Sequence, residues 1–165
     1  MTGDAPWLNE EEHRAFDSFV NLARNLFTAL SMDLQQVSGL SSADYEVLVN
    51  LTARPDGRIR PTELAAAMRW DSSRLSHHIR RMESRGLVAR ERFAEDRRGA
   101  LITLTPAGRS AIEQAAPGHV RAVRRLVVDA LTPAELRQLT ALSEKLLAGM
   151  ESGLPESQRD DVTRP

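Results

Sequence analysis

The sequence predicts a mainly α-helical fold that carries a small β wing. Three observations indicate this fold: helical periodicity around Leu75, two short β-prone runs joined by a polar link that ends in Gly99, and long apolar helical patterns at both ends of the chain. Between Pro61 and Gly108, a short helix, a tight turn, a second helix and a hairpin follow one another. That order is typical of a winged helix-turn-helix, in which one helix supports, the next enters the major groove and the wing reaches the adjacent DNA.

Two helices are expected before this central part. The second, over residues 42–53, follows Gly39 and ends before the turn sequence Pro55-Asp56-Gly57. The first, over residues 10–36, carries apolar side chains at helical spacing, which form a wide apolar stripe. The members of this stripe are Phe16, Phe19, Val20, Ala23, Leu26, Phe27, Leu30, Leu34 and Val37.

The central segment predicts two helices joined by a turn of a few residues. Pro61 suits the start of the first helix, because its fixed φ fits the first helical position. Asp71 is a good N-cap for the second helix, and Gly86 lies just past its end, where a positive φ is often needed. We expect Trp70, in the turn, to wedge the two helices together.

The second of these helices has two chemically different faces. Leu75, Ile79 and Met82 share one face and are expected to be buried. The opposite face carries hydrogen-bond donors and hydroxyls without a carboxylate: Ser73, Arg74, His77, Arg80, Arg81 and Ser84. A phosphate-lined groove favours this composition, since arginine binds phosphates or guanine edges, and serine and histidine bind phosphate oxygens or base edges. A solvated amphipathic helix is the alternative for this face taken alone.

The wing is expected as two short strands, over residues 87–93 and 100–104, joined by a polar turn. Arg97 and Arg98 would project from the tip of this turn, and arginine is favoured in a narrow minor groove, where negative potential is concentrated. Asp96 would repel phosphate, so we expect it to orient one of these arginines through an ion pair. A surface loop of mixed charge is the alternative.

A spaced motif spans the wing: Asp96-x-Arg98, five residues, then Leu104-Thr105-x-x-Gly108. It resembles the wing signature D-x-R-x5-L-T-x-x-G of MarR-type transcriptional regulators, and the preceding SRLSHHIRRMESRGLV is similar to their recognition helix and first wing strand. The resemblance extends in the order of elements over residues 7–150. It implies that Arg98 lies in the minor groove with Asp96 as its organiser. It also implies a set of residues at or near the major groove: Ser73, Arg74, Ser76, His77 and Arg80.

After the wing the sequence predicts two more helices. Pro106 opens a long helical pattern, which Pro117-Gly118 is expected to kink or break. Leu131-Thr132-Pro133 is a second stop, and Thr132 with Glu135 forms a capping box for the last helix.

The terminal helices are too long and too apolar for a small winged domain alone. Pairing with a second copy would bury them, and the family resemblance favours this dimer over the alternative of an intramolecular bundle. Two recognition helices would then meet half-sites about one helical turn apart, on a pseudo-palindromic operator. We expect one domain over residues 1–165, divided into dimerisation helices at 7–37 and 106–152, a DNA-binding lobe at 42–105 and a disordered tail at 153–165.

Composition and charge agree with this interpretation. Hydrophobic residues make up 41% and charged residues 27% of the chain, as in a soluble globular protein. No apolar run approaches the length of a membrane span and the N-terminus does not resemble a signal peptide, so a cytoplasmic protein is expected. The net charge of −1 divides into +6 for residues 54–109, from 13 arginines and 7 acids, and −7 for the rest. A basic middle between acidic flanks provides a local footprint for duplex DNA.

Catalysis is not predicted, because the four histidines lack H-E-x-x-H spacing and no phosphate loop or G-x-S-x-G elbow is present. His77 lies near Ser73 and Ser76 without an orienting carboxylate, so a hydrolase is the weakest alternative. The absence of cysteine excludes thiol-based redox sensing and cysteine metal sites. We expect no cofactor and no metal. A metal site of histidine and carboxylate ligands that uses His13 or His119 is the alternative.

The resemblance also implies a small aromatic or amphipathic effector, because the family often binds such molecules between the dimer helices and the DNA-binding lobe. Candidates to border that pocket are Trp7, His13, Phe16, Phe27 and Tyr45, with core packing as the alternative for the apolar ones. The expected function is a homodimeric repressor that an effector releases from its operator. The alternative is a helical protein-interaction module without DNA binding.

Overall fold

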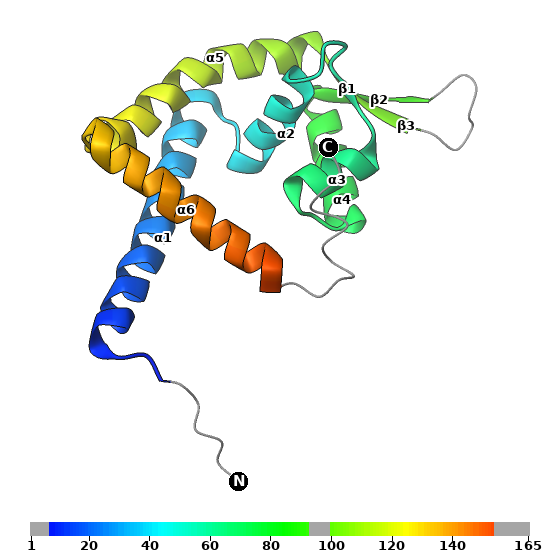
Figure 1. The fold of residues 1–165 in the computed structure, drawn as a ribbon. Helices are drawn as coiled ribbons and strands as arrows, with labels where there is room; N and C mark the ends of the chain where they lie inside the picture. Colours follow the sequence, from blue (N-terminus) through cyan, green and yellow to red (C-terminus); the bar gives the residue numbers. More distant parts are fainter. Residues whose placement is uncertain (1–6, 93–99, 154–165) are drawn as a thin grey trace.

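The computed structural model describes residues 7–92 and 100–153. Figure 1 shows a lobe made of short helices and a small sheet, from which the longer helices extend. The elements, in chain order, are α1 Glu10–Ser38, α2 Ser42–Thr52, β1 Arg58–Ile59, α3 Pro61–Met68, α4 Ser72–Ser84, β2 Val88–Arg92, β3 Ala100–Leu104, α5 Pro106–Val123, the π-helical turn η1 Arg124–Val128, and α6 Pro133–Gly153. This is the mainly helical winged helix-turn-helix fold that the sequence predicts.

The sheet is antiparallel with the strand order β1-β3-β2. Strand β1 was not expected from the sequence, because two residues are too short to show a period. It pairs with β3 through Arg58 opposite Thr103 and Ile59 opposite Ile102. Strand β2 begins one residue later than the expected strand over 87–93, and residue 93 lies outside the described residues. The turn that would carry Asp96, Arg97 and Arg98 lies outside the described residues.

One core holds the lobe together. Leu75, Ile79 and Met82 of α4 are buried in it, as the apolar face of that helix predicts. Trp70 packs against the same core between α3 and α4, which confirms its expected role as a wedge. Further core residues come from the end of α1, from α2, α3, the sheet and α5: Leu34, Leu48, Leu51, Ile59, Leu64, Ile102 and Ile112.

Helix α5 continues through Pro117, so a break at this position is wrong. Proline removes one backbone donor, but its own side chain points to solvent while the opposite face of the helix is packed. On that face Gly118 lies so close to α1 that a Cβ would stand 3.0 Å from Cγ1 of Val37. Packing against α1 therefore holds the helix in spite of the lost hydrogen bond. The stop before α6 is confirmed, since Thr132 and Glu135 form the expected capping box.

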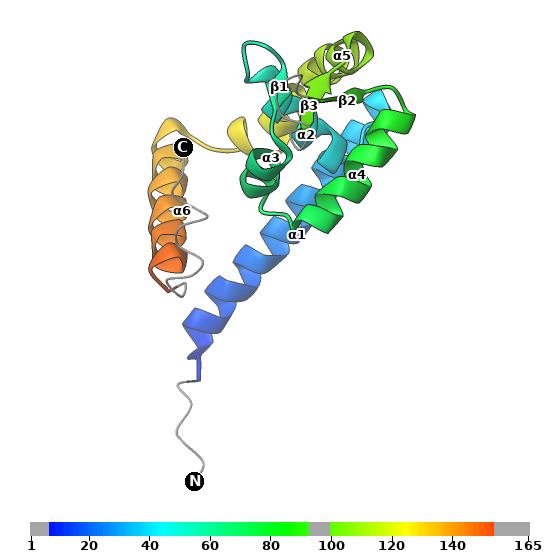
Figure 2. The same cartoon turned by 90° about the vertical axis from the view of Figure 1, so that its right-hand side faces the viewer.

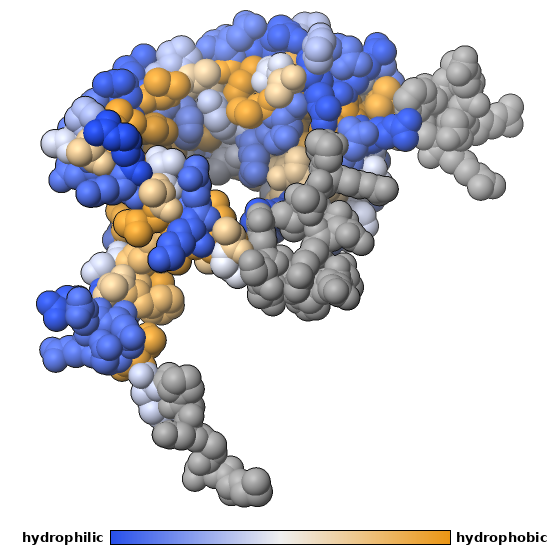
Figure 3. Space-filling model, viewed as in Figure 1, coloured by the Kyte–Doolittle hydropathy of each residue, from blue (hydrophilic) through white to orange (hydrophobic). Residues whose placement is uncertain are grey.

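The long terminal helices keep large apolar side chains in solvent. Phe16 and Phe27 of α1 are 58% and 69% exposed, and Leu142 of α6 is 61% exposed. Figure 2 shows α6 standing apart from the lobe, and Figure 3 shows apolar surface where α1 and α6 cross in this view and along α5. No intramolecular bundle within the described part of the single chain buries these side chains of α1 and α6. Within the described residues, no helix combines the length and apolar character that crossing a bilayer requires.

Candidate nucleic-acid interface

Helix α4 begins and ends where the sequence predicts. Oδ1 of Asp71 accepts a hydrogen bond from the backbone N–H of Arg74 at 2.8 Å, which satisfies one free donor of the first turn. At the other end the chain leaves the helix at Arg85 and passes through Gly86 with φ +71°. These two ends fix which side chains of α4 face away from the core.

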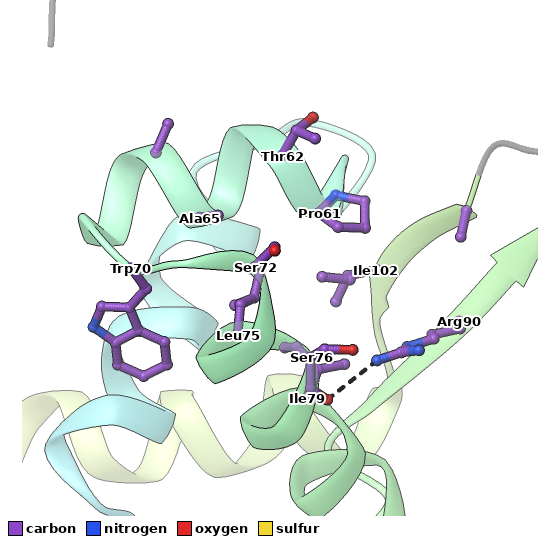
Figure 4. Close-up of a pocket in the computed structure, with 12 residues that line it drawn as sticks. Pro61, Thr62, Ala65, Trp70, Ser72, Leu75, Ser76, Ile79, Arg90 and Ile102 are labelled. Atoms are coloured by element: carbon purple, nitrogen blue, oxygen red, sulfur yellow. Dashed lines mark hydrogen bonds between the residues drawn. The ribbon is translucent and has the colours of Figure 1, made fainter. Parts of the chain in front are cut away.

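The outward face of α4 presents the residues that the sequence assigns to DNA. Ser73, Arg74, His77 and Arg80 are exposed on it. Ser76 is half-buried instead, and its side chain lines a cavity between α4 and the strands (Figure 4). The structure thus brings four of these five predicted α4 residues onto one open surface, with the fifth at its inner edge.

The outward face is positively charged without a compensating acid. Among the described residues, neither Arg74 nor Arg80 forms an ion pair with a carboxylate. The nearby acid of α4, Glu83, is directed to the wing, where its Oε2 lies 3.3 Å from Nε of Arg90. The charges of Arg74 and Arg80 are therefore available to a polyanion.

A buried acid on α2, Asp44, connects α2 to α4. The side chain of Asp44 is 5% exposed, and its Oδ2 accepts a hydrogen bond from Nη1 of Arg85 at 2.7 Å. Its Oδ1 lies 3.1 Å from Nε2 of His78, at ion-pair distance without the alignment of a good hydrogen bond. The backbone N–H of Ser41 donates to the same carboxylate at 3.0 Å. Burial alone would raise the pKa of Asp44, but the contacts with His78, Arg85 and Ser41 outweigh it and hold the pKa well below its usual range.

The hydrogen bond between Arg81 and His78 indicates the tautomer of His78. Nη2 of Arg81 lies 3.0 Å from Nδ1 of His78, and a guanidinium can only donate. Nδ1 is therefore the acceptor, and the ring carries its proton on Nε2, which faces Asp44. Sequence reasoning missed this pair because 34 positions separate Asp44 from His78. A signal was present all the same: His78 follows Leu75 by three positions and precedes Met82 by four, which is the spacing of the buried face.

The base of the wing is tied to α4. Nη2 of Arg90 donates a hydrogen bond to the backbone oxygen of Ser76 at 3.3 Å, and Arg58 of β1 lies 3.2 Å from the carboxylate of Glu91. Strands β1, β2 and β3 thus form one unit with the helix. Arg90 joins β2 to α4, and the pair of Arg58 with Glu91 joins β1 to β2.

Figure 4 shows the cavity between α3, α4 and the two wing strands, which has a volume of about 390 Å³. Its walls are mainly apolar, from residues such as Leu75, Ile79 and Ile102, and Arg90 and Ser76 contribute polar atoms. Trp70 lines its edge at the start of α4.

The five candidate effector residues are not gathered in the single chain. Trp7 precedes α1 and is 88% exposed, while His13, Phe16 and Phe27 are exposed along α1. Tyr45 on α2 is half-buried, its ring centroid lies 4.6 Å from that of His119, and burial raises the pKa of its hydroxyl. None of the five lines the cavity of Figure 4. Across residues 7–92 and 100–153 no three metal-binding side chains cluster, around His13 or elsewhere.

Known proteins resemble this chain in sequence and in fold. A family model for the MarR family matches residues 38–99. The structure of AbsC, a MarR family transcriptional regulator from Streptomyces coelicolor, shares 38% identity and a TM-score of 0.83, over 90% of this chain and 99% of AbsC. Sco3205, a MarR family transcriptional regulator from the same organism in complex with DNA, shares 36% identity and a TM-score of 0.83, over 92% and 96% of the two chains.

A curated relative covers a smaller part. The HTH-type transcriptional repressor YetL of Bacillus subtilis (strain 168) is 33% identical over 81 residues. The aligned region is 49% of this chain and 48% of YetL, so the chain spans about half the length of that relative.

Proposed function

The chain belongs to the MarR family of transcriptional regulators, which are non-enzymatic DNA-binding proteins, and on this premise we propose that it is a homodimeric repressor of a pseudo-palindromic operator. The observation that carries the proposal is the outward face of α4, where Arg74 and Arg80 are exposed without a partner carboxylate while the opposite face is buried. A helix held in this way presents its donors to a groove without having to rearrange.

Each expected DNA contact has a place in this proposal. Ser73, Arg74, His77 and Arg80 meet the major groove, and Ser76 stands at the inner edge of that surface. The wing carries Arg97 and Arg98 to the neighbouring minor groove, with Asp96 orienting one of them. The similarity to Sco3205, which was crystallised with DNA, supports this arrangement.

We expect Arg80→Ala and Arg98→Ala each to weaken duplex binding by about 1–3 kcal/mol while the protein keeps its fold and assembly. If Arg80 contacts a phosphate, the slope of log K against log salt also falls by about one. Fluorescence anisotropy with a labelled duplex at several salt concentrations measures both quantities.

Arg121→Ala is the matched control, because it removes the same charge from an exposed position on α5. Equal binding by the parent and by both test variants would remove α4 and the wing as the recognition surface. A parent that shows no salt-dependent duplex binding would favour the alternative of a protein-interaction module.

The dimer is proposed from the exposed apolar side chains of the terminal helices. Phe16, Phe27 and Leu142 leave in solvent an apolar surface of a kind that soluble monomers seldom expose. The helices within 7–37 and 106–152 are the proposed dimerisation segments, and the lobe at 42–105 reads DNA. Two-fold pairing would bury these side chains and place two copies of α4 on successive half-sites.

Leu142→Glu is expected to shift the protein toward a monomer and to weaken operator binding at least tenfold, because a buried charge disfavours association and one α4 then binds alone. Sedimentation equilibrium measures the first effect and anisotropy the second. Thr140→Glu is the control, because it adds the same charge on the other side of α6. A variant Leu142→Glu with unchanged mass would place the dimer contact elsewhere.

Release by a small aromatic or amphipathic effector is the remaining part of the proposal. Pairing of two chains would bring Trp7, His13, Phe16, Phe27 and Tyr45 toward the junction between the dimer helices and the lobe. A ligand there would act only by preferring a dimer whose two α4 helices are wrongly spaced for DNA. Titration of aromatic acids into the labelled complex tests it, with loss of anisotropy expected while the dimer persists.

Such a regulator acts on chromosomal DNA, so we place it in the cytoplasm.

A further inference from the structure

Trp70 contacts a proposed DNA-binding residue and a buried residue at once. The guanidinium carbon of Arg74 lies over the indole, 4.1 Å from the ring centroid. The imidazole of His78 meets the indole at an interplanar angle of 87°, with the ring centroids 5.2 Å apart. Trp70 itself is half-buried at the start of α4 (Figure 4). It therefore stands between the exposed face and the interior.

His78 is fixed in turn from the interior. Its Nε2 faces the carboxylate of Asp44, and its Nδ1 accepts a hydrogen bond from Arg81. Asp44 belongs to the corner between α1 and α2, because it accepts from the backbone N–H of Ser41, which precedes α2. Arg85 joins the same corner, donating to both Asp44 and the backbone oxygen of Gly39. A continuous series of contacts thus runs from this corner to Arg74.

Such a series changes what Arg74 contributes to binding. A free arginine side chain has many rotamers, and each one lost on binding lowers the affinity. A guanidinium stacked on an indole already has its plane and its position restricted, and it keeps its outer N–H groups for a phosphate or a guanine edge. The exposed Arg74 meets this description, since it stacks on Trp70 and forms no ion pair among the described residues.

We propose that Asp44, His78 and Trp70 are positioning residues that hold the guanidinium of Arg74 in the orientation in which it meets duplex DNA. None of the three has to touch the DNA. The proposal rests on the proposed function, because it requires Arg74 to contact the duplex. It differs from a general role in folding, since its effect passes through one named side chain.

The test is a double-mutant cycle between Trp70 and Arg74. The probe is a duplex selected from a random-sequence library with the parent protein, and the affinity is measured by anisotropy. Trp70→Leu is expected to weaken binding about threefold to tenfold, and Trp70→Phe to restore most of the loss because it offers a ring face again. In an Arg74→Ala background, Trp70→Leu is expected to cause no further loss.

The outcomes separate this inference from the function on which it rests. If Trp70→Leu weakens binding equally with and without Arg74, the indole supports the fold and the positioning role is wrong. If Arg74→Ala leaves the affinity unchanged while Arg80→Ala lowers it, the DNA-binding function stands and this inference is overturned. Failure of the parent to select any duplex would instead overturn the proposed function.

A spectroscopic arm tests the buried end of the series. In a Trp7→Phe background Trp70 is the only tryptophan, since the chain has two. Asp44→Asn, which keeps the size of the side chain, is expected to change the emission of Trp70 and to weaken duplex binding only when Arg74 is present. Unchanged emission together with unchanged affinity would overturn the proposal, because the series of contacts that begins at Asp44 would then not position Arg74. This variant also decides the question if Trp70→Leu does not fold.

Discussion

Asp44→Ala is expected to lower the free energy of unfolding by about 3 kcal/mol. The substitution removes the acceptor of hydrogen bonds from Arg85 and the backbone of Ser41, and the carboxylate that Nε2 of His78 faces at 3.1 Å. The N–H of His78 and that of Ser41 would be left without this partner in or near the core. Arg85 is 44% exposed, so water can hydrate its guanidinium when Asp44 is removed. The expected loss in the free energy of unfolding is therefore at the low end of the range for a broken buried ion pair. Urea denaturation monitored by circular dichroism measures the change.

The pH dependence of this loss has a defined sign. The pKa of Asp44 is lowered in the folded state, so its contribution is fully present above the pKa of an unfolded aspartate, about 3.9. The contribution declines as the pH falls toward the lowered pKa. The difference between the parent and Asp44→Ala should therefore be constant near neutral pH and shrink in strong acid.

Glu46→Ala is the matched control for Asp44→Ala, because Glu46 is an exposed acid on the same helix. It is expected to change stability by less than about 0.5 kcal/mol. If Asp44→Ala were as stable as Glu46→Ala at neutral pH, the network around Asp44 would contribute nothing to the fold.

The elements with a strong local signal were predictable from the sequence. Helix α4 has an N-cap at Asp71, a glycine at Gly86 and an apolar face at the right period, and all three are found as expected. Strand β1 was not predictable, because a two-residue strand is defined by its partner β3 and not by its own sequence. The break expected at Pro117 was wrong for a similar reason. The packing of α5 on α1 outweighs the local preference of proline to end a helix.

The features of the candidate site that depend on one helix were predictable from the sequence, and those that depend on a second element were not. Helical periodicity places Ser73, Arg74, His77 and Arg80 on one exposed face, and this face was predictable. Ser76 lies at the edge of the cavity because β2 and β3 approach it, and a single helix cannot report the position of a neighbouring strand. The contacts of Trp70 with Arg74 and His78 have helical spacing, but the acid that fixes His78 comes from another helix.

Gly108→Ala is expected to destabilise the lobe by about 3 kcal/mol or more. A Cβ at this position would overlap the backbone oxygen of Leu87 and press on Cδ1 of Leu104. A backbone carbonyl cannot turn aside as a flexible side chain does, so the first turn of α5 would have to move away from the link between α4 and β2. The glycine of the motif Leu104-Thr105-x-x-Gly108 thus has a steric reason that the sequence alone does not reveal.

Hydrogen bonds of Thr105 hold α5 in its position close to Leu87. Its Oγ1 accepts a hydrogen bond from the N–H of Gly108 at 2.9 Å and donates toward the carbonyl oxygens of Gly86 and Leu87, at 2.7 and 2.9 Å. A shift of α5 that made room for a methyl group would stretch these bonds, which join α5 to the residues that follow α4. We therefore expect Gly108→Ala to weaken duplex binding as well as to lower the unfolding midpoint.

Gly149→Ala distinguishes this steric effect from the general consequence of replacing glycine. Gly149 lies inside α6, and a Cβ there would meet no atom within 4 Å. Because alanine favours a helix by about 0.5–1 kcal/mol over glycine, Gly149→Ala should leave the unfolding midpoint unchanged or raise it. Thermal unfolding of the two variants beside the parent makes the comparison. If Gly108→Ala were as stable as Gly149→Ala, the start of α5 could not lie close enough to the backbone of Leu87 for a Cβ at position 108 to clash with it.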